Sequence, residues 1–377
     1  MKNAKKSTTA DLFFGPPTDE AELRYFSGFL APDPFALIRL RGRTHLVVNA
    51  MEEGRARREK NVENVWSPSA LGFSDEARPT AEELIRAAAK KLKIEAVNVS
   101  GMFPLGLAEK LRAKGLKVIH SSRDFHEGRS VKTEREIRLI ARAQKAAADA
   151  IRRARKILIE AGTDARGRLF WNGKILTAEI LRGEIEAQLL RADYVCEGTI
   201  VACGKDGADP HERGAGPLRA GQFIVLDIFP RKRTTGYWGD ITRTVIKGTA
   251  TVEQKRRFRA VCRAQRVALR MIRPGAVCAD VHQAVVRSFE QDGYPRTRVN
   301  GRLEGFIHGT GHGVGLEIHE APRLAMAPQR LCAGNVVTVE PGLYSRSAGG
   351  LRMEDLVVVT KTGYRKLADA PRGLILP

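Results

Sequence analysis

Two stretches of the chain follow the same plan, a capped helix and then a pair of strands that carry acidic residues. The helices begin at capping boxes, T-x-x-E at 133–136 and T-x-x-Q at 251–254. The helical segments 140–152 and 261–273 share six identical residues at a constant offset of 121. Helix-forming residues also recur by chance, so the strands that follow decide whether the chain is duplicated.

The first pair of strands is FIVLDIF, which carries Asp227, and YWGDITRTVI, which carries Asp240. A turn centred between Arg233 and Thr234 would place Asp227 directly opposite Asp240, with their Cβ atoms about 4.5–5.5 Å apart. Two carboxylates so close repel each other, and burial in apolar strands increases the repulsion. A multivalent cation would relieve it.

The second pair of strands repeats this arrangement. GNVVTVEPG carries Glu340, 113 residues after Asp227, and LRMEDLVVVT carries Glu354, 114 residues after Asp240. The nearly equal offsets predict a duplicated half-domain with one site at a pseudo-twofold axis, where four carboxylates converge. Such oxygen ligands with one imidazole suit manganese, cobalt or zinc. Two ions about 3.5–4 Å apart can share bridging carboxylates.

The segment HGTGHGVGLEIHE holds three of the eight histidines, His308, His312 and His319. Its glycines disfavour a helix and permit close backbone approach, so strand and turn are expected. In an extended chain His308 and His312 share a face, and His319 falls opposite unless a bulge intervenes. The segment matches neither a phosphate-binding loop nor HExxH. The residues alone leave open whether the histidines are ligands, proton carriers or polar filler.

The first part of the chain alternates strands and helices, which predicts a separate α/β domain. We expect strands at 36–40, 44–48, 95–99 and 116–120 and helices at 80–92 and 104–114. Residues 123–132 are expected to form a linker. The predicted domains are residues 1–128 and 129–377.

Composition excludes several classes of protein. The five cysteines are widely spaced with no CxxC pair, which is typical of free thiols in a reducing compartment. The net charge is +21. The basic clusters at 152–156 and 255–259 lie on helices without interleaved aromatic residues, so a solvated basic surface is favoured over specific nucleic-acid binding. No apolar run could cross a bilayer and no secretory signal is evident, so we expect a cytoplasmic protein without membrane contact.

The stretches VLDIFPRKRTTGYWGDITRT, HGTGHGVGLEIHEAP, TVEPGLY and LRMEDLVVVT resemble, in order and spacing, the pita-bread metallopeptidases. This family includes Xaa-Pro aminopeptidase, prolidase, methionine aminopeptidase and creatinase. The resemblance covers residues 129–377. The N-terminal part resembles the smaller domain of Xaa-Pro aminopeptidases, prolidases and creatinases, which methionine aminopeptidases usually lack. The implied fold is α+β, a duplicated pita-bread catalytic domain preceded by a smaller creatinase/prolidase-like α/β domain.

The resemblance also implies roles for individual residues. Asp227 would bind one metal ion, Asp240 and Glu354 would bridge two ions, and His312 and Glu340 would complete the second. The remaining catalytic roles fall to His308, His319, Arg352 and again Glu340. The substrate would contact His211, His308 and His319. The spacing of thirteen residues from Asp227 to Asp240 is longer than is common in the family, so the tip of that hairpin is expected to differ.

The implied reaction is hydrolysis of an N-terminal Xaa-Pro bond by a hydroxide that two divalent metal ions activate. Manganese is the expected metal, with cobalt or zinc as alternatives. The expected partner is a peptide with proline at its second position, and we expect a homodimer. A creatinase-like amidinohydrolase and a non-catalytic pita-bread binding protein are rival functions. The complete set of ligands argues against both, whereas aminopeptidase and dipeptidase activities stay equally open.

Overall fold

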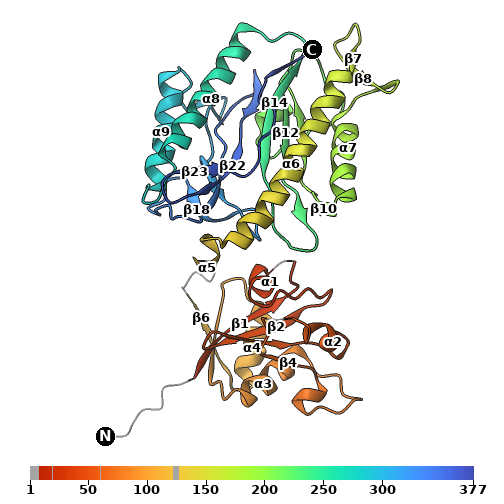
Figure 1. Ribbon diagram of the computed structural model, residues 1–377, viewed down its shortest axis with the longest axis vertical. Coiled ribbons are helices and arrows are strands. Elements are labelled where there is room, and N and C mark those ends of the chain that lie inside the picture. Colours follow the sequence, from red (N-terminus) through yellow and green to blue (C-terminus); the bar gives the residue numbers. More distant parts are fainter. Residues whose placement is uncertain (1–7, 19, 60, 122–126) are drawn as a thin grey trace. The chain divides into compact units, whose positions relative to one another are not determined.

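The structure is a computed structural model that describes residues 8–377 except 19, 60 and 122–126 (Figure 1). The chain divides into two compact units, residues 1–126 and 127–377. Among the described residues, no helix has both the length and the apolar surface that crossing a bilayer would require. All five cysteines are free, as predicted.

The first unit is built on a six-stranded sheet with the order β4-β3-β2-β1-β5-β6. Its strands are β1 (Thr9–Gly15), β2 (Phe35–Leu40), β3 (Arg43–Val47), β4 (Asn64–Trp66), β5 (Ala96–Val99) and β6 (Lys117–His120). Its helices are α1 (Ala21–Ser27), α2 (Glu53–Ala56), α3 (Ala81–Lys91) and α4 (Leu105–Ala113). The four predicted strands and two predicted helices are confirmed, whereas β1, β4, α1 and α2 had not been predicted.

Alternation along the strands gives this sheet two buried faces. Leu12 packs with Ile85 of α3 and Leu111 of α4, and the next residue, Phe13, packs with Leu23 of α1 and Ala56 of α2. The sheet therefore lies between two layers of helices, which is the predicted α/β architecture.

The predicted linker, residues 123–132, is only partly a linker. Residues 123–126 lie outside the described residues, and Glu127–Ser130 form the short helix α5. The predicted boundary between residues 128 and 129 falls within this helix.

The second unit consists of two halves with the same order of elements. The first half contains α6 (Glu134–Glu160), α7 (Ala178–Arg191), β11 (Ile200–Cys203), β12 (Ile224–Ile228) and β14 (Ile241–Lys247). The second half contains α8 (Val252–Met271), α9 (Cys278–Gln291), β17 (Gly311–Gly313), β19 (Val336–Val339) and β22 (Asp355–Val359). Each half forms its own sheet, β11-β12-β14-β24 and β18-β17-β19-β22-β23. The repetition that the sequence predicts is therefore present in the fold.

Short strands complete the second unit. They are β7 (Gly162–Thr163), β8 (Leu169–Trp171), β9 (Lys174–Ile175), β10 (Tyr194–Val195), β13 (Arg231–Lys232), β15 (Thr297–Val299), β16 (Arg302–Glu304), β18 (Glu320–Leu324), β20 (Gly342–Ser345), β21 (Gly349–Arg352), β23 (Tyr364–Lys366) and β24 (Ile375–Leu376). Helices α6 and α7 pack on the first sheet and α8 and α9 on the second, each pair with its own apolar core (Figure 1). Both long helices begin at the predicted capping boxes.

The predicted register of the first hairpin is wrong, because the partner of Asp227 lies two residues farther along the second strand than expected. Asp227 pairs with Thr242 rather than with Asp240, and the same register continues to the bridge between Arg231 and Trp238. The turn is therefore centred one residue later than predicted, because Gly236 adopts a left-handed φ of 78° at the end of the tip. Asp240 still lies diagonally across from Asp227 on the same face.

The second hairpin keeps Glu340 and Glu354 opposite each other. Val339 pairs with Asp355, and Met353 N–H donates to Pro341 O, so one register runs past both strand ends. Each of the two long strands predicted here is interrupted. The first gives β19 and β20, and the second gives β21 and β22. The breaks fall at the acidic residues, whose backbones leave the main sheet.

Candidate metal centre

A cavity of about 710 Å³ in the second unit collects the predicted site residues. All nine line it: His211, Asp227, Asp240, His308, His312, His319, Glu340, Arg352 and Glu354. They come from both halves of the duplicated unit. His211 lies on an exposed part of the wall, whereas the four carboxylates and His312 lie deeper.

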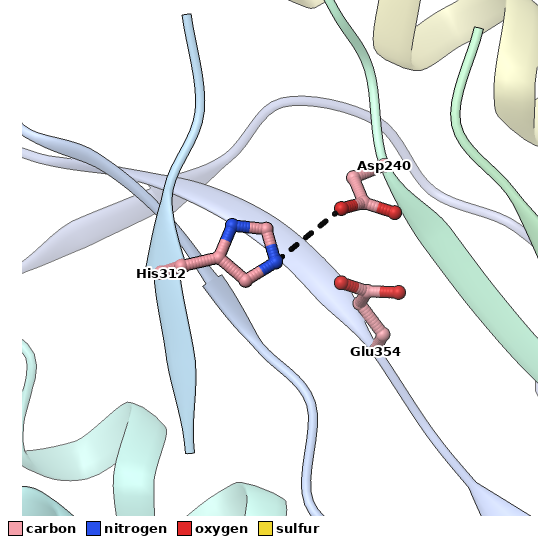
Figure 2. Close-up of side chains that lie close together, drawn as sticks. All are labelled: Asp240, His312 and Glu354. Carbon is pink, nitrogen blue, oxygen red and sulfur yellow. Dashed lines mark ion pairs between the residues drawn. The ribbon is translucent and has the colours of Figure 1, made fainter. Parts of the chain in front are cut away.

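Three of these residues converge most closely. Ligand atoms of Asp240, His312 and Glu354 all lie within 4.8 Å of one another, and Figure 2 shows the imidazole and the two carboxylates pointing toward one centre. His312 Nε2 lies 3.6 Å from Asp240 Oδ2 and 3.3 Å from Glu340 Oε1. This combination of oxygen ligands with one nitrogen is the predicted one.

The protonation of His312 explains why a cation fits there. Its Nδ1 lies 3.1 Å from Gly313 O, so the proton of the neutral ring is on Nδ1 and the Nε2 lone pair faces the carboxylates. Burial lowers the pKa of His312 to about 4, which keeps the ring neutral at pH 7. A lone pair facing carboxylate oxygens is unfavourable unless a proton or a metal ion lies between them.

The carboxylates show the crowding expected from the sequence. Burial raises the pKa of Asp240 well above its ordinary value, and the charges of Glu354 and Asp227 raise it further. Burial also raises the pKa of Glu354, and the charge of Glu340 raises it further. Burial and mutual repulsion therefore favour a proton or a cation on these carboxylates. The residues present therefore fit divalent metal ions.

Thr242 connects two of the carboxylates, a role that sequence reasoning missed. Its hydroxyl oxygen lies 2.7 Å from Asp227 Oδ1 and 2.7 Å from Glu354 Oε2. The corrected register accounts for this position, because Thr242 is the direct partner of Asp227. The signal was present in the sequence, since Thr242 alternates with Asp240 on one strand face.

Arg352 begins a chain of hydrogen bonds that leads away from the carboxylates. It forms an ion pair with Asp227, and its Nη1 donates to Tyr344 Oη at 3.0 Å. Tyr344 Oη lies 2.9 Å from His308 Nε2. Burial raises the pKa of Tyr344 to about 12 and lowers that of His308 to about 4, so both are neutral at pH 7. Tyr344 was not predicted, although it stands in the quoted stretch TVEPGLY.

His308 uses both ring nitrogens within this chain. Its Nδ1 lies 2.7 Å from Gly309 O and carries the proton, while its Nε2 accepts from Tyr344. In the part of the chain that the structure describes, no hydrogen bond occupies the ring of His319, which is exposed on the cavity wall. His319 is therefore better placed than His308 to donate to a bound molecule.

A bulge intervenes between His312 and His319, and the two side chains lie side by side rather than on opposite faces. The pairing of β17 with β18 shifts between His312 and Gly313, and the two imidazole rings meet edge to face with their centroids 4.3 Å apart. Glycine is required along this segment because the backbone approaches closely. A Cβ at Gly311 would lie 2.0 Å from Thr338 O, and one at Gly313 would lie 2.3 Å from Ala321 O.

A buried ion cluster fixes the end of the histidine segment. Glu320 follows His319 directly, and its carboxylate lies 2.5 Å from Lys132 Nζ and 3.4 Å from an Arg129 nitrogen. All three side chains are buried. Sequence reasoning missed this cluster, because it assigned Lys132 to a linker and gave Glu320 no partner.

Two glutamines occupy equivalent positions in the duplicated helices, 121 residues apart. Gln144 of α6 donates to Asp240 O at 2.8 Å and accepts from Asp240 N–H at 2.6 Å. Gln265 of α8 donates to Val339 O at 3.0 Å and to Met353 O at 3.1 Å, next to Glu340 and Glu354. Each half therefore uses its R-A-Q segment to hold the backbone that carries an acidic residue.

Comparison with known proteins assigns the family. Residues 138–361 match the family described as Metallopeptidase family M24, and residues 16–131 match the Creatinase/Prolidase N-terminal domain. The chain belongs to metallopeptidase family M24. Its fold is the pita-bread fold with the smaller N-terminal domain, as the sequence predicts, and family membership implies that divalent metal ions serve as its cofactor.

Relatives of this M24 peptidase extend over most of its length. It is 29% identical over 286 residues to the Xaa-Pro dipeptidase of Pyrococcus horikoshii, covering 75% of each chain. It is 30% identical over 343 residues to the putative dipeptidase YkvY of Bacillus subtilis, covering 88% of this chain and 85% of that protein. Among solved structures, the prolidase of Pyrococcus horikoshii OT3 superposes with a TM-score of 0.79 at 26% identity, covering 98% and 96% of the two chains.

The raised pKa values of Asp240 and Glu354 predict that metal binding to this M24 peptidase displaces protons. A cation binds the ionised carboxylates, so metal affinity should also fall as the pH is lowered. Titration calorimetry with Mn²⁺ in two buffers of different ionisation enthalpy measures the release. Equal heats in the two buffers would show that no proton is displaced.

Gln144→Met is predicted to destabilise the metal-free peptidase by about 1–3 kcal/mol, because it leaves the buried N–H and C=O of Asp240 without partners. Urea denaturation measures the change. Gln283→Met, at an exposed position of α9, is the matched control and should change stability by less than about 0.5 kcal/mol. Equal stabilities for the two variants would show that Gln144 does not hold the Asp240 segment.

Proposed function

We propose that this enzyme hydrolyses the bond between the first residue and proline in Xaa-Pro dipeptides. The observation that carries the proposal is the convergence of Asp240, His312 and Glu354 in a cavity that Asp227 and Glu340 also line. A non-catalytic relative would have no need to keep this repulsive group of buried carboxylates. Relatives named Xaa-Pro dipeptidase and prolidase support the choice of substrate.

We propose Asp227, Asp240, His312, Glu340 and Glu354 as the ligands of two divalent ions, with Asp240 and Glu354 shared between the ions. Manganese is the expected metal, because the site has many carboxylate oxygens and no thiolate. When bound, the two ions would supply a nucleophilic hydroxide at neutral pH and polarise the scissile carbonyl.

The protein side chains would supply the proton transfers and the hydrogen bonds. Glu340, whose Oε1 lies 3.3 Å from His312 Nε2, would take a proton from the attacking water and pass it to the leaving nitrogen. His319 has a free ring on the cavity wall and would donate to the oxygen on which negative charge develops. Arg352 and Tyr344 hold Asp227 and His308 in place.

The shape and charge of the cavity favour a dipeptide. A volume of about 710 Å³ is within the usual range for small-molecule sites. The amino terminus of a dipeptide would lie beside the carboxylates. Two arginines, Arg213 and Arg323, line the same cavity, and either one could pair with the C-terminal carboxylate. His211, also on the exposed wall, would contact the substrate.

The predicted specificity depends on the scissile bond, which is a tertiary amide. Its nitrogen belongs to the proline ring and carries no hydrogen, so the site must bind this bond without an N–H donor from the substrate. We predict that the Mn²⁺-loaded enzyme cleaves Ala-Pro, acts little on Ala-Ala, and does not cleave N-acetyl-Ala-Pro. Ala-Pro amide, which lacks the terminal carboxylate, should be a poor substrate for a dipeptidase.

The rival functions give different results in the same assays. Equal rates on Ala-Pro and Ala-Ala would contradict the specificity for proline, and equal rates on Ala-Pro and its amide would indicate an aminopeptidase. Release of urea from creatine would support an amidinohydrolase. The homodimer and the cytoplasmic location stay predictions, which light scattering and cell fractionation can test.

A further inference from the structure

A row of arginines follows the outer face of helix α8 and continues just past its end. The arginine stripe consists of Arg256, Arg259, Arg263, Arg266, Arg270 and Arg273, all exposed. The five members on the helix stand three or four residues apart, so their side chains share one face, and Arg273 follows two residues after the helix ends. At a rise of 1.5 Å per residue, the helical part of the stripe is about 21 Å long.

Carboxylates neutralise only part of this stripe. Arg256 lies 3.9 Å from Glu253, and Arg263 lies 3.3 Å from Asp292. Within the part of the chain that the structure describes, no carboxylate lies within 4.0 Å of the other four arginines: Arg259, Arg266, Arg270 and Arg273. Like charges one helical turn apart repel each other, so the stripe does not serve to stabilise the helix.

The equivalent helix of the first half differs in its C-terminal part. At the offset of 121, the exposed Arg135, Arg138 and Arg142 of α6 match the first three arginines of the stripe. Farther along α6, Lys145 and Arg152 both lie 2.6 Å from Asp149, and Lys156 lies 3.8 Å from Glu160. Asp149 stands where α8 has Arg270, so the duplicated fold does not require the uncompensated charge of the C-terminal part of α8.

We propose that the arginine stripe binds the phosphate backbone of nucleic acid without reading its base sequence. Planar guanidinium groups match phosphate oxygens in pairs, and a regular row of them suits a polymer with regularly spaced phosphates. The net charge of +21 adds long-range attraction. None of the six arginines lines the catalytic cavity, so binding is independent of the proposed hydrolysis.

The surroundings of the stripe exclude two other modes of binding. Recognition of single-stranded bases uses exposed aromatic side chains, and the exposed large apolar residue on the described α8 is Val252, at its first turn. A helix that lies on a membrane exposes its apolar face. The apolar face of α8, which includes Val261, Ala264 and Ala268, is buried in the second core. What remains on the surface is charge alone.

Fluorescence anisotropy of a short labelled DNA duplex with the full-length protein tests the proposal. Binding is expected at about 50 mM salt, to fall steeply with added salt, and to be equal for unrelated duplex sequences. The variant R259Q/R266Q/R270Q should bind at least about tenfold more weakly, and its slope of log affinity against log salt should be smaller by about 3.

The matched control is K145Q/R152Q/K156Q, which removes the same net charge from the paired surface of α6. It should retain affinity within about twofold of the unmodified protein if the stripe is the site. No binding at about 50 mM salt, or equal weakening in both variants, overturns the proposal. Binding to anionic lipid vesicles but not to DNA also overturns it. Circular dichroism and peptidase assays of both variants verify that they fold.

Discussion

Asp240→Asn should lower kcat/KM for Ala-Pro by at least about a thousandfold, which corresponds to about 4 kcal/mol of transition-state stabilisation. The amide keeps the shape of the side chain but removes a negative charge from the centre that Asp240, His312 and Glu354 share. The variant should also bind less metal, because an amide is a poorer bridging ligand than a carboxylate. Steady-state kinetics and elemental analysis of the same preparation measure both effects.

Metal-free Asp240→Asn should nevertheless be at least as stable as the metal-free wild type at pH 7. The pKa of Asp240 is raised in the folded state, so its contribution to stability is present at low pH and is lost as the pH rises through that folded pKa. The neutral amide avoids this loss. Asp369→Asn, at an exposed position, is the control and should change neither activity nor metal content. Full activity of Asp240→Asn would remove Asp240 from the catalytic centre.

His319→Ala should lower kcat by about 10²–10³ while the metal content stays nearly unchanged, because His319 would donate to the reacting oxygen and not bind an ion. Its ring meets that of His312 edge to face, so the two histidines are close enough for their roles to be confused. Elemental analysis separates them, since His312→Ala should lose metal.

His120→Ala, at an exposed position of β6 in the first unit, controls for the general effect of losing an imidazole. It should leave both kcat and metal content unchanged. If His319→Ala loses its metal ions, the division between metal ligands and substrate-side residues is wrong. If its kcat is unchanged, another group donates to the reacting oxygen.

The sequence predicts which residues meet in this protein better than it predicts how their strands pair. The nearly equal offsets of Asp227 to Glu340 and Asp240 to Glu354 identify two hairpins whose acidic residues lie on one side, and the structure brings them together. The register needs the position of the turn as well. That position depends on the left-handed conformation of Gly236, which a glycine permits but does not impose.

Residues that hold the site were harder to predict than those that form it. Tyr344 of β20 reaches His308 from 36 residues away, and Lys132 meets Glu320 from 188 residues away. A tyrosine, lysine or glutamate in isolation is most often a surface or core residue, so only the fold gives these side chains their partners. Gln144 and Gln265 are among the six identities between the two helical segments, but identity alone does not reveal the backbone groups that they bind.

Anomalous diffraction from crystals of the Mn²⁺-loaded enzyme would test the two-metal site most directly. Two peaks about 3.5–4 Å apart are predicted in the cavity, with Asp240 and Glu354 between them, Asp227 on one ion, and His312 and Glu340 on the other. A single peak, or peaks that lie away from these five side chains, would contradict the account.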